Sequence, residues 1–135
     1  MEPTTVVIAD DHLVLRAGIC CMIEAIPSIK IIGEASNGVE AIQLVEELHP
    51  DILLLDVEMP VMDGIEALEI LNGKDCPTKV IILSGHNDQG FMLETKSRGA
   101  AGYFIKGNDP SLLLKAILEV GSVSSDKNKQ AYNAL

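Results

Sequence analysis

The sequence is poor in aromatic and basic residues. Only 3% of its 135 residues are aromatic while 47% are hydrophobic, so the core has to be built from aliphatic side chains. The chain has 10 Lys and Arg against 20 Asp and Glu, which gives a formal net charge of −10. Such a chain is disfavoured as a direct nucleic-acid binder, because that binding begins by neutralising phosphates. It suits a cation site or a basic partner surface instead.

Cysteine is scarce, and no hydrophobic run is long. Cys20 and Cys21 are adjacent, and Cys76 is the third cysteine. An odd number argues against a disulfide framework and predicts a reducing cytoplasm, and the spacing gives no zinc pattern. No apolar run could span a bilayer, and the acidic start MEPTTVVIADD is not typical of a signal peptide. We therefore expect a cytoplasmic chain that is not associated with a membrane.

The chain alternates between two kinds of segment. Short apolar runs rich in β-branched residues are typical of strands, and apolar residues three or four apart are typical of helices. The expected strands are residues 5–9, 30–35, 52–55, 79–83 and 101–105. The expected helices are residues 13–26, 38–48, 64–72, 88–98 and 110–120. This alternation predicts one α/β domain with a parallel sheet that is covered by helices on both faces.

Charges and helix-capping residues refine the arrangement. The strand at 30–35 carries charges and a glycine, so we expect it at an edge of the sheet. Asp63 and Asp109 are expected to cap the helices that follow them. The predicted domain is residues 1–121, and the polar stretch 122–135 is expected to be a tail or the start of a linker.

Polar residues follow four of the expected strands. Asp10 and Asp11 follow the first, Asp56 the third, Ser84 the fourth and Lys106 the fifth. Each alone is explained by the abundance of Asp and Ser in turns. Together they indicate a site, because parallel strands end at one edge, and open α/β sheets bind ligands there.

The residue types at this edge suggest phosphoryl chemistry. Three carboxylates at close quarters need a compensating cation, and Mg²⁺ prefers carboxylates, water and phosphate oxygens. We expect no Cys or His in the cluster, which disfavours zinc, and we expect His12 and His86 to be solvated loop residues. Lys106 and the hydroxyl of Ser84 can both contact a phosphoryl oxygen. The set predicts a carboxylate that accepts and holds a phosphoryl group.

Four segments, in this order, resemble the receiver domain of two-component response regulators. They are ADDH (9–12), LLDVEMPVMDG (54–64), ILSGH (82–86) and GYFIK (102–106), and the likeness spans residues 5–120. DDHLVLRAGI (10–19) and SGHND (84–88) look more particularly like the NarL/LuxR-type regulators. The resemblance implies a doubly wound, flavodoxin-like sheet of five parallel strands in the order 2-1-3-4-5. It also implies a signalling domain rather than an enzyme, phosphorylated by a sensor histidine kinase.

The resemblance assigns a phosphoacceptor and a metal site. Asp56 matches the phosphoacceptor. Asp10, Asp11, Asp56 and the backbone carbonyl of Glu58 match the groups that hold Mg²⁺, or Mn²⁺ in its place. The side chains of Glu58 and His86 match two positions that tune the lifetime of the acyl phosphate.

The resemblance also assigns a switch. Ser84 matches the hydroxyl that moves towards the phosphoryl group, and Lys106 matches the lysine that pairs with it. Tyr103 matches an aromatic residue that swings inward, although packing explains an aromatic strand residue equally well. Gly107 stands where many receivers have a proline after a cis peptide bond, and we expect no cis bond there. The implied output is a changed surface on the fourth helix, fifth strand and fifth helix, used for homodimerisation or for control of an output domain.

Two other functions fit a similar topology less well. A Mg²⁺-dependent aspartyl-phosphate phosphatase of haloacid-dehalogenase type needs a second Asp two residues after the nucleophile, where this chain has Glu58. A flavodoxin-like flavin binder needs a Ser-, Thr- or Gly-rich phosphate loop after the first strand, where this chain is acidic.

Overall fold

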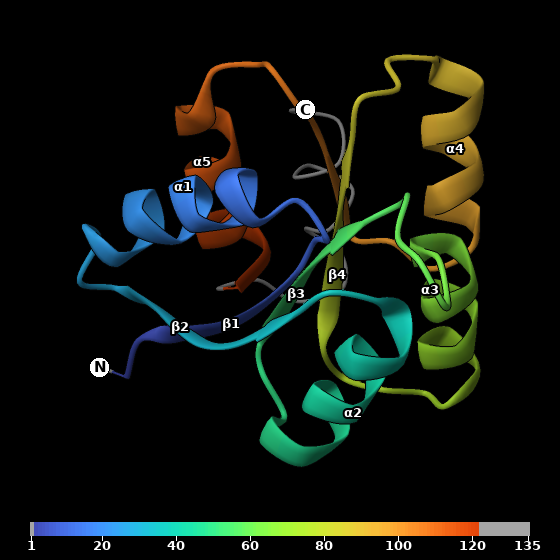
Figure 1. Cartoon of the computed structure of the whole chain (residues 1–135), viewed down its shortest axis with the longest axis horizontal. Helices are drawn as coiled ribbons and strands as arrows, with labels where there is room; N and C mark the ends of the chain where they lie inside the picture. The colour runs from blue at the N-terminus through green and yellow to red at the C-terminus, as the bar shows by residue number, and fades with distance from the viewer. Residues whose placement is uncertain (1, 122–135) are drawn as a thin grey trace.

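The computed structural model describes residues 2–121, in which a central sheet is flanked by helices on both faces (Figure 1). The elements alternate along the chain as the sequence predicts. They are β1 (Thr4–Ala9), α1 (Leu13–Glu24), β2 (Ile29–Ala35), α2 (Gly38–Leu48), β3 (Ile52–Asp56), α3 (Gly64–Gly73), β4 (Lys79–Ser84), α4 (Gln89–Ser97), β5 (Gly102–Ile105) and α5 (Pro110–Gly121). The stretch 122–135 lies outside the described residues, so the domain boundary stays a prediction.

All five strands are parallel and lie in the order β2-β1-β3-β4-β5. This confirms the doubly wound α/β sheet and the edge position of the charged second strand. The central strand, β3, is buried along its whole length, including Asp56 at its end. Burial of a Leu or Ile side chain contributes about 2 kcal/mol. The strands that carry the polar edge are therefore held rigidly.

The helices form two layers that cover opposite faces of the sheet. Helices α1 and α5 lie on one face, and α2, α3 and α4 lie on the other (Figure 1). Successive residues of each strand point to opposite faces, so Ile8 and Leu54 belong to the α1/α5 core, whereas Val7 and Leu53 belong to the other. Both cores are almost entirely aliphatic, as the composition requires.

The two expected helix caps are present. The side chain of Asp63 accepts a hydrogen bond from the backbone N–H of Glu66 at 2.9 Å, and that of Asp109 accepts one from Ser111 at 3.0 Å. These bonds satisfy backbone donors in the first turns of α3 and α5. Asp63 thus has a structural role.

The β3–α3 loop folds tightly against the end of β3. The backbone N–H of Met62 donates to the carbonyl of Pro60 at 2.7 Å, and the intervening Val61 has φ of 68°. Positive φ is strained for a β-branched residue. A Cβ atom on Gly64 would stand 2.1 Å from the carbonyl oxygen of Asp56, so only glycine lets the loop approach this closely.

The helices of residues 2–121 are 9 to 12 residues long. Cys20, Cys21 and Cys76 are all free thiols. Over residues 2–121, no helix is both long enough and apolar enough to cross a membrane.

Candidate functional site

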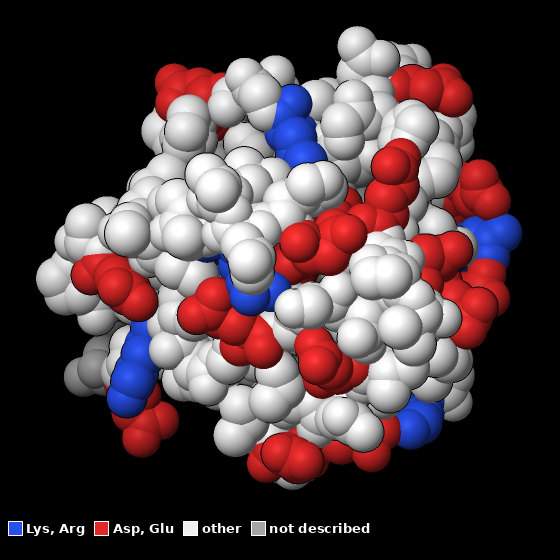
Figure 2. Space-filling model, viewed as in Figure 1, with Lys and Arg blue, Asp and Glu red and all other residues white. Residues whose placement is uncertain are grey.

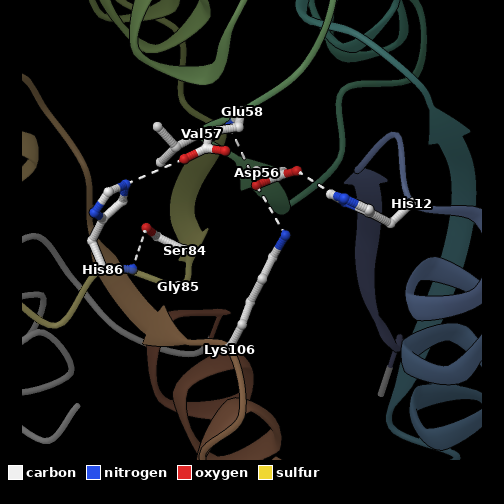
Figure 3. A pocket seen from close by; sticks show the side chains of 8 residues that line it. All are labelled: His12, Asp56, Val57, Glu58, Ser84, Gly85, His86 and Lys106. Atoms are coloured by element: carbon white, nitrogen blue, oxygen red, sulfur yellow. Dashed lines mark hydrogen bonds and ion pairs between the residues drawn. The ribbon is translucent and has the colours of Figure 1, made fainter.

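The polar residues expected at one edge of the sheet do lie together there. Asp56, Ser84 and Lys106 surround one pocket (Figure 3). Asp56 and Ser84 are the last residues of β3 and β4, rather than the first residues after them. A pocket of about 360 Å³ opens at this edge. Its lining residues are His12, Asp56, Val57, Glu58, Ser84, Gly85, His86 and Lys106. The volume suits a small charged group with water.

Lys106 joins two buried carboxylates. Its Nζ lies 3.0 Å from Oδ1 of Asp56 and 3.2 Å from Oδ2 of Asp10. The side chain of Asp10 is fully buried and that of Asp56 is 3% exposed. The ammonium therefore holds the carboxylates of β1 and β3 in place. Gly107 follows with φ of 95°, which favours glycine, and residues 2–121 contain no cis peptide bond.

The three charged groups perturb one another. Burial raises the pKa of Asp56, and the charge of Asp10 raises it further, although Lys106 opposes both. Burial also acts to raise the pKa of Asp10, but hydrogen bonds from His12 and attraction to Lys106 outweigh it and lower that pKa. The pKa of Lys106 is raised because its two carboxylate partners outweigh the effect of burial. The edge thus carries more negative charge than one lysine neutralises.

Two buried carboxylate oxygens of the cluster, Oδ2 of Asp10 and Oδ2 of Asp56, accept no hydrogen bond from residues 2–121. The first is paired with the ammonium of Lys106 at 3.2 Å, whereas Oδ2 of Asp56 lies 3.9 Å from Nδ1 of His12. A buried carboxylate oxygen without a donor is costly unless a cation or a ligand satisfies it. Carboxylate oxygens of Asp10, Asp11 and Asp56, with a ring nitrogen of His12, all lie within 4.8 Å of one another. The donor set therefore fits a divalent cation.

His12 corrects the sequence analysis, which excluded histidine from the cluster. Its Nδ1 lies 3.0 Å from Oδ1 of Asp10 and 3.3 Å from Oδ1 of Asp11. It also lies 3.9 Å from Oδ2 of Asp56. The acidic neighbours attract the ring, which turns inward although the side chain is 63% exposed. The feature of the sequence that could have predicted this placement is that His12 directly follows the two acidic residues.

Ser84, His86 and Tyr103 form a second group beside the acids. The backbone N–H of His86 donates to Oγ of Ser84 at 3.0 Å, and the hydroxyl of Tyr103 donates to the carbonyl of His86 at 2.8 Å. The side chain of Tyr103 points inward and is fully buried, and burial raises its pKa. The ring of Phe91 in α4 contacts both His86 and Tyr103, at centroid distances of 5.2 and 6.2 Å.

Glu58 and His86 meet across the pocket. Nε2 of His86 lies 3.3 Å from Oε1 of Glu58, and the two side chains are 54% and 78% exposed, respectively (Figure 3). Their side chains come from different loops, after β3 and β4. The pair therefore stands at the solvent side of the site.

Arg16 is a supporting residue that the sequence analysis missed. Its Nη1 donates to the carbonyls of Asp10 and Ala35 at 2.8 and 2.9 Å, and its Nε lies 3.1 Å from Oε1 of Glu34. The guanidinium thus ties the end of β1 to the end of β2. Arg16 stands three residues before Ile19, which belongs to the buried stripe of α1. This spacing could have predicted that Arg16 faces the sheet.

The surface around the site is acidic. Asp and Glu side chains gather over the middle of the face in Figure 2, and Lys and Arg side chains are scattered. This distribution agrees with the net charge of −10.

Comparison with known proteins decides the family. Residues 6–118 match the model of the response regulator receiver domain. The chain belongs to this family. It is 41% identical over 116 residues to the nitrate/nitrite response regulator protein NarL of Escherichia coli K12, covering 86% of this chain and 54% of that protein. It is 44% identical over 108 residues to the transcriptional regulatory protein YdfI of Bacillus subtilis, covering 80% and 50%. The receiver domain thus spans about half the length of the curated relatives it matches.

Solved receiver structures share the fold. The receiver domain of the response regulator NarL from Mycobacterium tuberculosis superposes with a TM-score of 0.87 and 31% identity, covering 92% of this chain and all 100% of that one. A LuxR-family DNA-binding response regulator from Staphylococcus aureus gives a TM-score of 0.82 and 29% identity, covering 88% and 99%. The chain is therefore a receiver domain of the NarL/LuxR type, a phosphorylation-activated signalling switch. The phosphatase alternative has no support.

Proposed function

We propose that Asp56 accepts a phosphoryl group from the phosphohistidine of a sensor histidine kinase. An oxygen of Asp56 attacks the phosphorus, the P–N bond breaks, and the leaving imidazole nitrogen of the kinase takes up a proton from the solvent. The product is an acyl phosphate on Asp56. The observation that carries the proposal is Oδ2 of Asp56, which is buried at the floor of a pocket and accepts no hydrogen bond from residues 2–121.

The acidic residues would hold Mg²⁺, with Mn²⁺ able to replace it. Asp11, Asp56 and the backbone carbonyl of Glu58 are the proposed ligands, and Asp10 supports the site through a bound water. When bound, the ion neutralises the carboxylates and the charge of the incoming phosphoryl group. Lys106 is already 3.0 Å from Asp56, so its ammonium is placed to contact a phosphoryl oxygen on that residue.

The switch would begin at Ser84. The hydroxyl of Ser84 accepts a hydrogen bond from the backbone N–H of His86, so a movement of this hydroxyl towards a phosphoryl oxygen, to which its O–H would donate, also displaces or strains its link to the β4–α4 loop. The β4–α4 loop would then move, and Tyr103 and Phe91 contact that loop. We propose that this movement changes the α4–β5–α5 surface and promotes homodimerisation.

Glu58 and His86 would set the lifetime of the signal. Their side chains meet at the solvent side of the pocket, 3.3 Å apart, where water must enter to hydrolyse the acyl phosphate. Phosphotransfer and slow autodephosphorylation, both promoted by the domain itself, are the extent of the proposed catalysis.

The role of the whole protein follows from its relatives. Curated relatives of about twice the matched length are named as transcriptional regulators. We propose that the receiver controls a DNA-binding output domain in the full-length protein, without contacting nucleic acid itself. We place the protein in the cytoplasm, because its three cysteines are unpaired.

The test is an intact mass measurement of the wild type and Asp56→Asn after incubation with Mg²⁺ and a small phosphodonor. One phosphoryl group on the wild type and none on the variant is the expected result. A wild type that gains no mass, or a variant that gains as much, rejects Asp56 as the acceptor.

A further inference from the structure

The first residue of α2, Gly38, lies against the loop that follows Asp56. Its backbone N–H donates to the carbonyl of Met62 at 2.9 Å. Within residues 2–121, this is the one backbone–backbone hydrogen bond that joins loop residues 58–62 to another segment of the chain. The first turn of α2 therefore holds the loop in which Glu58 lies.

Space, rather than backbone conformation, requires glycine at position 38. Gly38 is not among the described residues with positive φ, and alanine is more favourable than glycine in a helix. A Cβ atom here would stand 2.7 Å from the carbonyl oxygen of Met62 and 2.8 Å from its Cγ. The half-buried side chain of Met62 can adjust, but its carbonyl oxygen moves only with the loop. Glycine thus permits a close contact between α2 and the loop, although it weakens the helix.

The other end of the same loop is held at the phosphoacceptor. The N–H of Gly64 donates to the carbonyl of Val57 at 2.8 Å, and a Cβ atom on Gly64 would stand 2.1 Å from the carbonyl oxygen of Asp56. Between the two ends, Val61 has a strained φ of 68°, and its side chain is 82% exposed. Packing of that side chain does not explain the strained turn, so we attribute it to the backbone contacts at Gly38 and Gly64.

We propose that Gly38 is a positioning residue for the phosphorylation of Asp56. Through Met62 it fixes the loop that carries Glu58, whose carbonyl is a proposed Mg²⁺ ligand and which lines the pocket. This inference rests on the proposed function, but it concerns α2, from which no residue lines that pocket. Such coupling is reciprocal, so binding of Mg²⁺ at the site strengthens the bond between Gly38 and Met62.

The test compares the wild type, Gly38→Ala and Gly18→Ala. Gly18 is the matched control, because it lies in α1 and a Cβ atom there would meet no atom of another segment within 4 Å. Intact mass follows phosphorylation by acetyl phosphate at saturating Mg²⁺, and calorimetry gives the Kd for Mg²⁺. We expect Gly38→Ala to be phosphorylated at least threefold more slowly and to bind Mg²⁺ at least threefold more weakly. Gly18→Ala should match the wild type in both measurements.

The same experiment separates positioning from a merely structural role. A structural role would lower the free energy of unfolding of Gly38→Ala but leave the phosphorylation rate and the Mg²⁺ Kd of the folded protein unchanged. Chemical denaturation measures the free energy of unfolding and shows that the rates refer to folded protein.

Amide hydrogen exchange of the wild type tests the link without a substitution. Mg²⁺ should slow exchange of the N–H of Gly38 at least threefold, as measured by NMR. The N–H of Lys79 is the control, because it donates to the carbonyl of Asp51 at the opposite edge of the sheet and should be unaffected. This measurement decides the question if Gly38→Ala does not fold.

The possible results have distinct consequences. A rate or a Kd of folded Gly38→Ala within threefold of the wild type overturns the proposal, and so does exchange at Gly38 that Mg²⁺ does not alter. A wild type that gains no phosphoryl group rejects the proposed function and this inference with it. Equal phosphorylation of the wild type and Gly38→Ala rejects this inference alone.

Discussion

The Nζ atom of Lys106 lies 3.0 Å from Oδ1 of Asp56. This ion pair links the end of β5 to the end of β3, and its lysine also contacts Asp10. It makes Lys106 the group best placed to sense a charge added to Asp56.

Lys106→Ala should separate phosphorylation from its consequence. The variant keeps Asp56 and the acidic cluster, so it should still accept a phosphoryl group, but it lacks the cation that draws the phosphoryl group towards β5. We expect phosphorylated Lys106→Ala to remain monomeric by light scattering where the wild type dimerises. Lys30→Ala, which removes an exposed lysine of β2, is the matched control. Dimerisation of Lys106→Ala equal to that of the wild type would count against the assigned role.

Asp56→Asn should stabilise the metal-free protein at neutral pH. The pKa of Asp56 is raised in the folded state by burial, so its ionisation opposes folding. The protonated carboxyl of Asp56 contributes stability that is fully present below its ordinary pKa of 3.8. This contribution is lost as the pH rises through the raised pKa of Asp56 in the folded protein. Asparagine avoids this loss, and each pKa unit corresponds to about 1.4 kcal/mol. Chemical denaturation at several pH values measures the difference.

The difference in unfolding free energy between Asp56→Asn and the wild type should shrink towards acid pH. Added Mg²⁺ should also reduce this difference at neutral pH, because the ion would stabilise the ionised Asp56 of the wild type. Asp75→Asn, at an exposed position with positive φ, should change little and serves as the control. A gain in Asp56→Asn that is independent of pH would show that ionisation of Asp56 is not its cause.

Much of this arrangement follows from sequence periodicity. Asp56 ends an aliphatic run, and the parallel sheet brings it to the edge that Asp10, Ser84 and Lys106 also reach. Because all the strands run in the same direction, residues that follow them lie at the same edge of the sheet. The positions of the strands in the sequence were therefore sufficient to predict that these polar residues meet. Residue-level roles came from resemblance, because spacing says nothing about which carboxylate reacts.

Side-chain direction in loops and at helix starts was not predictable in this way. His12 directly precedes α1, where a side chain either caps the helix or turns away from it. The local charge, rather than the spacing of apolar residues, decides which of the two directions the side chain takes. Arg16 reaches two carbonyls across β1 and β2, a contact that depends on how α1 sits on the sheet. The turn at Val61 depends on a tertiary contact of the loop with the end of β3.

Arg16→Met should weaken both the fold and the metal site. It removes charge-assisted hydrogen bonds to the carbonyls of Asp10 and Ala35, which should cost about 2–3 kcal/mol of unfolding free energy. The freed Asp10–Asp11 turn should then bind Mg²⁺ several-fold more weakly by calorimetry. Arg16→Lys, which keeps the charge without the planar fork, should recover part of the Mg²⁺ affinity. Unchanged Mg²⁺ affinity in Arg16→Met would restrict Arg16 to a role in stability.

Glu58→Ala and His86→Ala should each shorten the lifetime of the phosphorylated form. Loss of either side chain opens the solvent side of the pocket to water. An exposed pair is worth up to about 1 kcal/mol, so we expect a change of no more than about fivefold. The double variant should decay no faster than the faster single one, because the two act as a pair. Loss of phosphoryl mass after donor removal gives the rates, and longer lifetimes or additive effects would contradict this role.

The central claim concerns which carboxylate carries the phosphoryl group, and borohydride reduction followed by peptide mass spectrometry locates it. Borohydride reduces an aspartyl phosphate to homoserine and leaves free carboxylates intact. After phosphorylation of the wild-type protein, we predict homoserine at position 56 and unmodified aspartate at positions 10 and 11. Homoserine at position 10 or 11, with Asp56 intact, would contradict the account.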